Sequence, residues 1–134
     1  MTSLPRISVV INTLNREKSL RDTLESFRWQ TYRGQFEVIV VNGPSTDGSQ
    51  ALIESWVPKI RIGRCADANL SMSRNIGICM AAGDIVAFID DDGVPEPEWL
   101  EQIAAGYDRE EVGGVVACVL AFLFVVRRRK TEES

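Results

Sequence analysis

Three short apolar runs limit the folds open to this chain more than any other feature of its sequence. They are residues 7–11 (ISVVI), 36–41 (FEVIVV) and 85–89 (IVAFI), and each is rich in β-branched residues. Near-continuous apolar strands of this kind are typical of parallel sheets that are covered on both faces. A weaker run at residues 59–62 predicts a further short strand. The runs therefore predict a buried parallel sheet.

Helical patterns separate these predicted strands. Leu20, Leu24 and Phe27 recur at the spacing of one helix face, and Asn15 stands where an N-cap would open that helix. Three further helices are predicted: one capped by Asp47, one over residues 71–82, and one that begins near residue 97. Their expected inward-facing residues are, in chain order, Leu52, Trp56, Met72, Ile76, Cys79, Met80, Trp99, Leu100, Ile103 and Tyr107.

The alternation of strands and helices predicts an α/β fold with a doubly wound, mostly parallel sheet and helices on both faces. In open sheets of this kind, ligands bind outside the carboxyl ends of the strands. Three polar segments follow predicted strands, at residues 12–16, 42–47 and 90–92. We therefore expect these segments to converge on one site.

Composition narrows the chemistry. The chain has no histidine and a net charge of -4, so within it acid–base chemistry falls to carboxylates, and a general role in nucleic-acid binding is disfavoured. Residues 84–111 hold ten acidic residues and one basic residue, which suits a metal site, although charge alone favours an ordinary solvated acidic surface. Three widely spaced cysteines, Cys65, Cys79 and Cys118, predict buried thiols and neither a disulfide frame nor a zinc site.

The acidic run after residues 85–89 is the first candidate site. Asp90, Asp91 and Asp92 would repel one another, and a hard divalent cation such as Mg²⁺ or Mn²⁺ removes that conflict. Alternation along an extended segment would aim Asp90 and Asp92 the same way and Asp91 elsewhere. An exposed acidic turn leading to Gly93 is the alternative.

Arg74 is the candidate of opposite charge. It stands near the start of the helix over residues 71–82, about 200° around from Met72, where exposed N–H groups and the helix dipole favour anions. A guanidinium there can hold a phosphate, although a plain surface arginine is the alternative. Asn42 could hydrogen-bond a base or ribose edge. The glycine-rich motifs of dinucleotide and P-loop enzymes are missing from the sequence.

Three segments together resemble a known family: SVVINTLNR, VIVVNGPSTDGS and SRNIGICMAAGDIVAFIDDDGVPEPEWL. In order and spacing they are similar to the N-terminal, nucleotide-sugar-binding half of family 2 glycosyltransferases of the GT-A fold. That resemblance covers residues 7–116 and implies a nucleoside-diphosphate-sugar donor, Mn²⁺ or Mg²⁺, and inversion at the anomeric carbon. It further implies a donor site in which Thr13 and Asn15 line the nucleoside, Asn42 faces the base, Arg74 approaches the diphosphate, Asp90 and Asp92 form the D-x-D pair at ribose and metal, and Asp67 and Asn69 lie nearby.

Two departures from the family pattern matter. The family usually has an acidic residue where Asn42 stands, so the identity of the base stays open. Family members also continue into an acceptor-binding half that carries a carboxylate general base, and no such base is evident in this chain. The resemblance thus predicts a partial domain over residues 1–119, truncated after a fifth strand near residues 112–119, and an unknown saccharide or lipid-linked acceptor. A non-catalytic nucleotide-binding fragment and a nucleotidyltransferase-like enzyme are the alternatives.

The predicted tail, residues 120–134, is apolar and then basic. Residues 115–126 form twelve consecutive apolar positions, followed by RRRK. A membrane-spanning helix needs about 20 apolar residues, so a sheet strand, a short membrane-contacting segment and an oligomer contact are the interpretations left open. Residues 7–11 are too short for a signal-peptide core. We expect a cytoplasmic location, at the inner face of the membrane if the tail makes contact.

Overall fold

The computed structural model describes residues 4–106, 114–115 and 124–127. The four strands and four helices predicted before residue 107 are all present, and Tyr107 and Cys118 lie outside the described residues. The elements are, in chain order, β1 (Ile7–Thr13), α1 (Glu17–Ser26), the 3₁₀ helix η1 (Phe27–Trp29), β2 (Phe36–Asn42), α2 (Ser49–Ser55), β3 (Arg61–Arg64), α3 (Leu70–Met80), β4 (Ile85–Asp90), α4 (Trp99–Gly106), β5 (Gly114–Val115) and β6 (Phe124–Arg127).

The sheet is mostly parallel, as predicted. Its strand order is β3-β2-β1-β4-β6-β5, and the first four strands run parallel to one another. At the far edge β6 pairs antiparallel with β4, and β5 pairs antiparallel with β6. Strand β6 lies within the segment predicted as a tail. The predicted domain boundary at residue 119 lies outside the described residues and stays a prediction.

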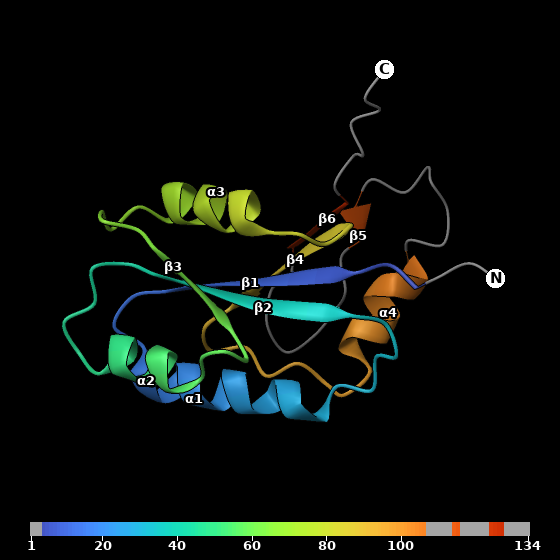
Figure 1. Cartoon of the computed structure of the whole chain (residues 1–134), viewed down its shortest axis with the longest axis horizontal. Helices are drawn as coiled ribbons and strands as arrows, with labels where there is room; N and C mark the ends of the chain where they lie inside the picture. The colour runs from blue at the N-terminus through green and yellow to red at the C-terminus, as the bar shows by residue number, and fades with distance from the viewer. Residues whose placement is uncertain (1–3, 107–113, 116–123, 128–134) are drawn as a thin grey trace, which may run out of the picture.

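Helices cover both faces of the sheet, which confirms the doubly wound α/β fold. Figure 1 shows α3 on one face and α1, α2 and α4 toward the other. The larger core lies on the side of α1, α2 and α4, and its sheet residues are those that alternate inward along each strand. Its helix residues include those predicted to face inward: Leu20, Leu24, Phe27, Leu52, Trp99, Leu100 and Ile103 are buried, with Trp56 partly buried against them.

The α3 face differs from its prediction. Met72 and Cys79 were expected to face inward, but both are exposed, while Ser73 and Gly77 are buried. A Cβ at Gly77 would lie 2.4 Å from Val10 Cγ1, so the helix rests on β1 through its smallest residues. Close approach of the backbone thus decided the rotation of α3. The argument that placed Arg74 opposite an inward Met72 is therefore wrong, although Arg74 is exposed.

One carboxylate ties α3 to the amino-terminal ends of the strands. Glu37 on β2 accepts hydrogen bonds from Ser8 Oγ at 2.6 Å and from Ala82 N at 2.8 Å. Arg61 Nη1 donates to the same carboxylate at 2.9 Å and forms an ion pair with it. Burial alone would raise the pKa of Glu37, but these hydrogen bonds and the Arg61 charge outweigh it and hold the pKa below its ordinary value of 4.5.

Glu37→Gln is expected to lower the free energy of unfolding at neutral pH by about 1–2 kcal/mol, because its hydrogen bonds lose their charge. A lowered folded pKa means that this stabilisation is complete above the ordinary value of 4.5 and is lost as pH falls through the folded value. Urea unfolding from about pH 3 to pH 7 measures the effect. The gap between wild type and variant should shrink below about pH 4.5; a gap of constant size would contradict the charged role of Glu37.

Within the described residues, no helix is both long enough and apolar enough to span a membrane.

Candidate functional site

The strand register brings the predicted polar segments to one edge of the sheet. Thr13 is opposite Asn42, and Asn42 is opposite Arg64, while Asn12 is opposite Asp90. These residues end or nearly end β1, β2, β3 and β4. Figure 1 shows the loops that follow β1, β2 and β3 on the same side of the molecule, at its left. The predicted convergence at the carboxyl edge is therefore confirmed.

The loops after β1 and β2 are bonded to each other. Asn15 has a φ of 53°, a left-handed conformation that asparagine tolerates better than most residues. Its Oδ1 accepts from Thr46 N at 2.7 Å and Asp47 N at 3.3 Å, while its own N–H donates to Ser45 Oγ at 3.0 Å. The prediction that Asn15 is the N-cap of α1 is therefore wrong. Asn15 instead holds the turn after β2.

Asp47 serves the start of two helices. Its Oδ1 accepts from Ser49 N, the first residue of α2, at 2.9 Å, but the N-cap residue is Gly48, so Asp47 supports the start of this helix from one position earlier than predicted. Its Oδ2 accepts from Glu17 N at 3.3 Å, the first residue of α1. The hydrogen bonds from Ser49, more than that from Glu17, hold the pKa of Asp47 below its ordinary value. One carboxylate thus fixes both helices at the edge where the site is predicted.

Asn42 is largely covered. Its side chain belongs to a residue that is 4% exposed, and Nδ2 donates to Gln50 Oε1 at 2.8 Å. Its Oδ1 accepts from Ser45 Oγ at 2.6 Å. Each end of the amide therefore has an internal partner, and burial leaves little of the side chain open to a base, although Nδ2 and Oδ1 can each make one further hydrogen bond. In this structure Asn42 shapes the loop after β2.

The three aspartates form a turn in which their environments differ. Gly93 N donates to Asp90 O at 3.0 Å, which closes the turn. Asp90 and Asp92 are exposed, whereas Asp91 is half-buried and accepts from Thr13 Oγ1 at 3.0 Å. Asp91 is thus partly turned away from solvent, but residues 91 and 92 form a turn and not the extended segment on which the alternation argument rested. We refer to residues 90–93 as the aspartate turn.

Charge around the aspartate turn is unevenly balanced. Burial raises the pKa of Asp91, and the charges of Asp92 and Asp90 raise it further. The hydrogen bond from Thr13 and the charge of Arg16 act in the opposite direction and do not offset burial. Around Asp91 the charges of Asp90 and Asp92 thus act against that of Arg16, and a bound cation would relieve the repulsion among the three carboxylates.

The start of α3 adjoins the same edge. Asn69 is the N-cap of α3 and its Oδ1 accepts from Met72 N at 3.1 Å; its own N–H donates to Asp67 O at 2.8 Å. Asn12 Nδ2 donates to Ser73 Oγ at 2.7 Å, which ties the helix to β1. Since Asn12 is opposite Asp90, the first turns of α3 lie beside the aspartate turn. Arg74 follows Ser73 directly and is exposed there.

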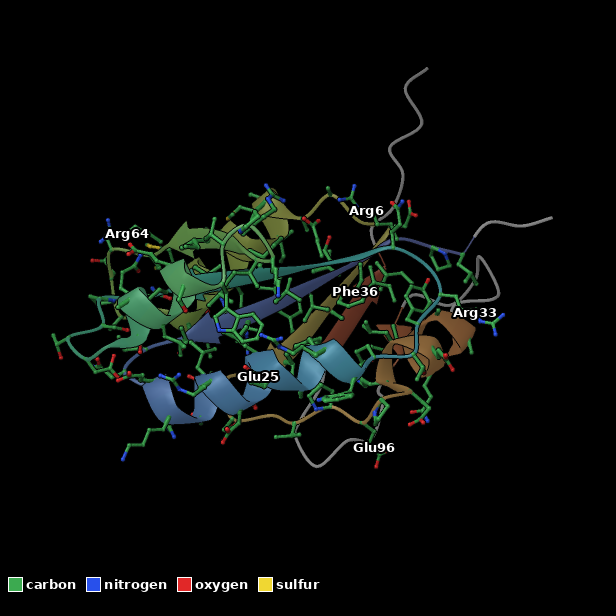
Figure 2. All side chains as sticks on the ribbon, turned by 60° about the horizontal axis from the view of Figure 1, so that its bottom comes forward. Arg6, Glu25, Arg33, Phe36, Arg64 and Glu96 are labelled. Atoms are coloured by element: carbon green, nitrogen blue, oxygen red, sulfur yellow. The ribbon has the colours of Figure 1, made fainter. Side chains whose placement is uncertain are left out.

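Four residues of this edge were not singled out from the sequence as site residues. Arg64 ends β3, and Figure 2 shows it at the opposite end of the molecule from Arg6 and Arg33. Asn12 and Arg16 lie in a segment that was predicted to converge, but neither was given a role. Thr23 on α1 contacts the aspartate turn, and the only signal for this in the sequence was the face of the helix on which Thr23 lies.

A cavity of about 300 Å³ lies elsewhere, where α1 and α2 end. It is lined in part by Arg21, Arg28 and Lys59, and the Arg28 guanidinium stands 4.8 Å over the Trp56 ring. Both helices begin at the carboxyl edge of the sheet, so their ends lie at the amino edge. This cavity and the aspartate turn are therefore separate features.

The carboxylates of the aspartate turn fit one kind of metal site. Among the described residues, no group of three or more acidic, cysteine or histidine side chains could hold a metal ion. Mg²⁺ and Mn²⁺, however, are commonly bound by one or two carboxylates together with substrate phosphates. Asp90 and Asp92 supply two exposed carboxylates. They fit a cation that shares its ligands with a phosphate, and they do not fit an all-protein cage.

An α/β domain whose polar residues gather where parallel strands end has the architecture in which open α/β sheets bind ligands. Residues 8–133 match the profile of Glycosyl transferase family 2, and the chain belongs to that family. Among curated relatives, it is 35% identical over 119 residues to the glucosyl-dolichyl phosphate glucuronosyltransferase of Haloferax volcanii. It is also 32% identical over 132 residues to the glycosyltransferase AglE of the same organism.

These matches cover most of this chain but less than half of each relative. The alignments take in 83% and 87% of this chain and 38% and 41% of the two Haloferax proteins. A mannosyltransferase from Pyrobaculum calidifontis, solved with GDP-Man and Mn²⁺, superposes with a TM-score of 0.82 at 22% identity, over 95% of this chain and 46% of that one. Residues 1–349 of TarS from S. aureus, solved with UDP-GlcNAc, give 0.74 at 28% identity over 83% and 33%. The fold is therefore the GT-A fold of glycosyltransferases.

Proposed function

We propose that this chain is the donor-binding half of a glycosyltransferase and binds a nucleoside-diphosphate-sugar together with Mn²⁺ or Mg²⁺. The aspartate turn carries the proposal: two exposed carboxylates, Asp90 and Asp92, stand at the carboxyl edge of a parallel sheet, beside the first turns of α3. Open α/β sheets bind ligands at this edge, and the start of a helix favours phosphates.

The related structures support this donor class without fixing the base. The Pyrobaculum mannosyltransferase is described with a guanosine donor and Mn²⁺, and TarS with a uridine donor. In this chain the residue at the end of β2 is Asn42, whose amide is engaged with Gln50 and Ser45. A neutral amide there can both donate and accept a hydrogen bond, so it does not select one base as an accept-only carboxylate would. We therefore propose a nucleoside diphosphate of open base identity.

Five residues of the site have a role in the proposed reaction. Asp90 and Asp92 would hold the cation and the ribose, Arg74 would contact the diphosphate, and Thr13 and Asn15 would line the nucleoside side of the site. A bound divalent cation neutralises charge on the diphosphate as it leaves. Arg74 contributes to the same end, because a guanidinium near the diphosphate stabilises negative charge that grows in the transition state. Transfer with inversion further needs an acceptor and a general base.

Metal removal tests this proposal. We expect the chain to bind a nucleoside diphosphate in the presence of Mn²⁺ and to lose nearly all of that affinity when EDTA replaces the metal. The reason is that the diphosphate would otherwise face the carboxylates of Asp90 and Asp92 without a cation between them. Isothermal titration calorimetry with UDP, GDP, ADP and CDP, each with Mn²⁺ and then with EDTA, measures the difference. Equal affinity in both conditions would show that the aspartate turn holds no metal.

Nucleotide binding without turnover is the second candidate function. The chain spans less than half the length of the curated relatives it matches, so the transfer activity that their names describe comes to it only as a proposal. A radiolabelled-donor assay separates the two candidates, because a binding-only protein releases no sugar to water or to any acceptor in a broad panel. The nucleotidyltransferase alternative is disfavoured, because the loop after β1, Thr13 to Arg16, has no glycine and the family profile matches glycosyltransferases.

A further inference from the structure

The aspartate turn has a second attachment, to α1, that the proposed donor contacts do not use. Thr23 lies in the middle of α1 and is fully buried. Its Oγ1 is 2.7 Å from Gly93 O and 3.0 Å from Asp91 O. The same hydroxyl is 3.1 Å from Ser19 O, the carbonyl one helical turn earlier. A single side chain therefore reaches two carbonyls of the turn that carries Asp90 and Asp92.

The chemistry of these groups makes the contact specific. Carbonyl oxygens only accept hydrogen bonds, and Gly93 is buried, so the turn needs a donor from the protein on that side. The Thr23 hydroxyl provides it and is nearest to Gly93 O. A valine at position 23 would keep the shape of the side chain but leave these carbonyls facing a methyl group. The turn would then have to shift toward other donors, because leaving a buried acceptor unpaired costs its full desolvation penalty.

Asp91 is held from a second direction. Its carboxylate accepts from Thr13 Oγ1 on β1, while its backbone carbonyl faces Thr23 on α1. A hydroxyl has one hydrogen to donate, so Thr23 bonds Gly93 O or Asp91 O at any moment; the residue between the two exposed carboxylates is thus fixed at its side chain, and the backbone on either side of Asp92 lies within reach of one donor. Asp90 and Asp92 are its direct neighbours in the chain, so their backbones have little freedom to move. Groups that orient metal ligands without touching the metal typically contribute about ten- to a hundredfold in metal affinity.

We propose that Thr23 is a positioning residue for the cation site: its hydroxyl sets the aspartate turn so that the carboxylates of Asp90 and Asp92 are presented together to the cation. The identity of the ligand in this proposal rests on the proposed function, but the attachment of the aspartate turn to Thr23 is a property of the protein alone. Thr23 touches neither donor nor metal. It acts through the backbone of the turn.

Four variants test this role. Thr23→Val and Thr23→Ala remove the hydroxyl, the first with the volume kept and the second without adding a methyl near Asp91 O. Thr23→Ser keeps the hydroxyl. Ser26→Ala is the matched control, because Ser26 lies on the same helix and its Oγ donates at 2.5 Å to the carbonyl of Thr23, within the helix and away from the turn.

Two measurements are made on each folded variant, with thermal unfolding to establish that it is folded at the working temperature. The first is calorimetric affinity for Mn²⁺ with UDP or GDP, whichever the wild type binds, and for the matching nucleoside without metal. We expect Thr23→Val and Thr23→Ala to weaken metal-dependent binding by about tenfold and to leave nucleoside affinity close to that of the wild type. Thr23→Ser and Ser26→Ala should match the wild type in both affinities. Thr23→Val or Thr23→Ala with wild-type metal-dependent affinity would overturn the proposal.

The second measurement is hydrogen–deuterium exchange of the peptide that contains residues 90–93, in the absence of any ligand. We expect the hydroxyl-free variants to exchange these amides faster by about an order of magnitude, and Thr23→Ser and Ser26→Ala to match the wild type. Unchanged exchange in both hydroxyl-free variants would overturn the proposal that the Thr23 hydroxyl holds the aspartate turn. If the wild type binds no metal–nucleotide complex, the proposed function fails on the first measurement, while this one still decides whether Thr23 holds the turn.

Discussion

Replacing Asp92 with asparagine is expected to weaken Mn²⁺-dependent nucleoside diphosphate binding by about a hundredfold, the upper end for the loss of one charged contact. Asp92 is exposed at the aspartate turn, where its carboxylate is available to a cation. Asparagine has nearly the same size, but its neutral oxygen is a weaker ligand for a hard divalent ion. The loss should therefore come from the charge and not from a change of shape.

Asp91→Asn is the matched control for this substitution. Its carboxylate is half-buried and accepts from Thr13 Oγ1, and an asparagine oxygen can accept the same hydrogen bond. We expect a loss several times smaller than that of Asp92→Asn. Calorimetry at a saturating and a limiting Mn²⁺ concentration measures both variants, because a ligand defect should be partly rescued by excess metal. Equal losses that excess metal does not rescue would mean that the aspartates maintain the turn and do not bind a cation.

The sheet could be predicted from the sequence because its signal is local. The strands β1, β2 and β4 each contain an apolar run rich in β-branched residues, a pattern that only a strand buried on both faces can bury completely. The inward residues of α1 and α4 were likewise predictable, because large apolar residues at helical spacing define a single buried face. Where size and hydrophobicity agree, one periodicity decides both the element and its orientation.

The rotation of α3 could not be predicted in the same way. Hydrophobic periodicity favoured Met72 and Cys79 as buried residues, but the helix packs through Ser73 and Gly77. The deciding factor is the distance between helix and sheet: at Gly77 even a methyl group would collide with Val10. Glycine and serine have no hydrophobic weight in a periodicity argument, so a contact built from small residues leaves no signal in it. Only the packing partner on β1 reveals it.

The site was predictable in place but not in its internal bonding. The rule that ligands bind at the carboxyl ends of parallel strands identified the edge, and the acidic run identified the turn. The bonds that fix the edge, however, join residues far apart in the chain: Asn15 with Thr46, Thr13 with Asp91, and Thr23 with Gly93. Each of these residues looked like a cap, a site residue or an ordinary helix position in its own segment, because a local pattern holds no information about a partner loop.

Arg74→Ala is expected to lower affinity for the nucleoside diphosphate by about ten- to a hundredfold while leaving affinity for the nucleoside almost unchanged. Arg74 follows Ser73, which Asn12 ties to the end of β1 opposite Asp90, so its guanidinium is carried by the part of α3 that adjoins the aspartate turn. A hydrogen bond between a guanidinium and a phosphate is charge-assisted on both sides and is among the stronger single contacts available in water. The nucleoside has no phosphate, so the affinity for it should not change when Arg74 is replaced.

Two arginine variants control for charge and for place. Arg33→Ala removes the same charge near the opposite end of the molecule from Arg64, as Figure 2 shows, and should leave affinity for the diphosphate unchanged. Arg64→Ala removes a charge at the carboxyl edge itself. Arg64 ends β3, which lies two strands away from β1, and β1 is the neighbour of the strand that leads into the aspartate turn. Calorimetry of all three variants with nucleoside, nucleoside monophosphate and nucleoside diphosphate in Mn²⁺ separates a contact with phosphate from a general field effect. If Arg64→Ala loses diphosphate affinity and Arg74→Ala does not, the phosphates lie over β3 and the assignment to α3 is wrong. If Arg74→Ala loses nucleoside and diphosphate affinity equally, Arg74 supports the fold of α3 and does not contact the phosphates.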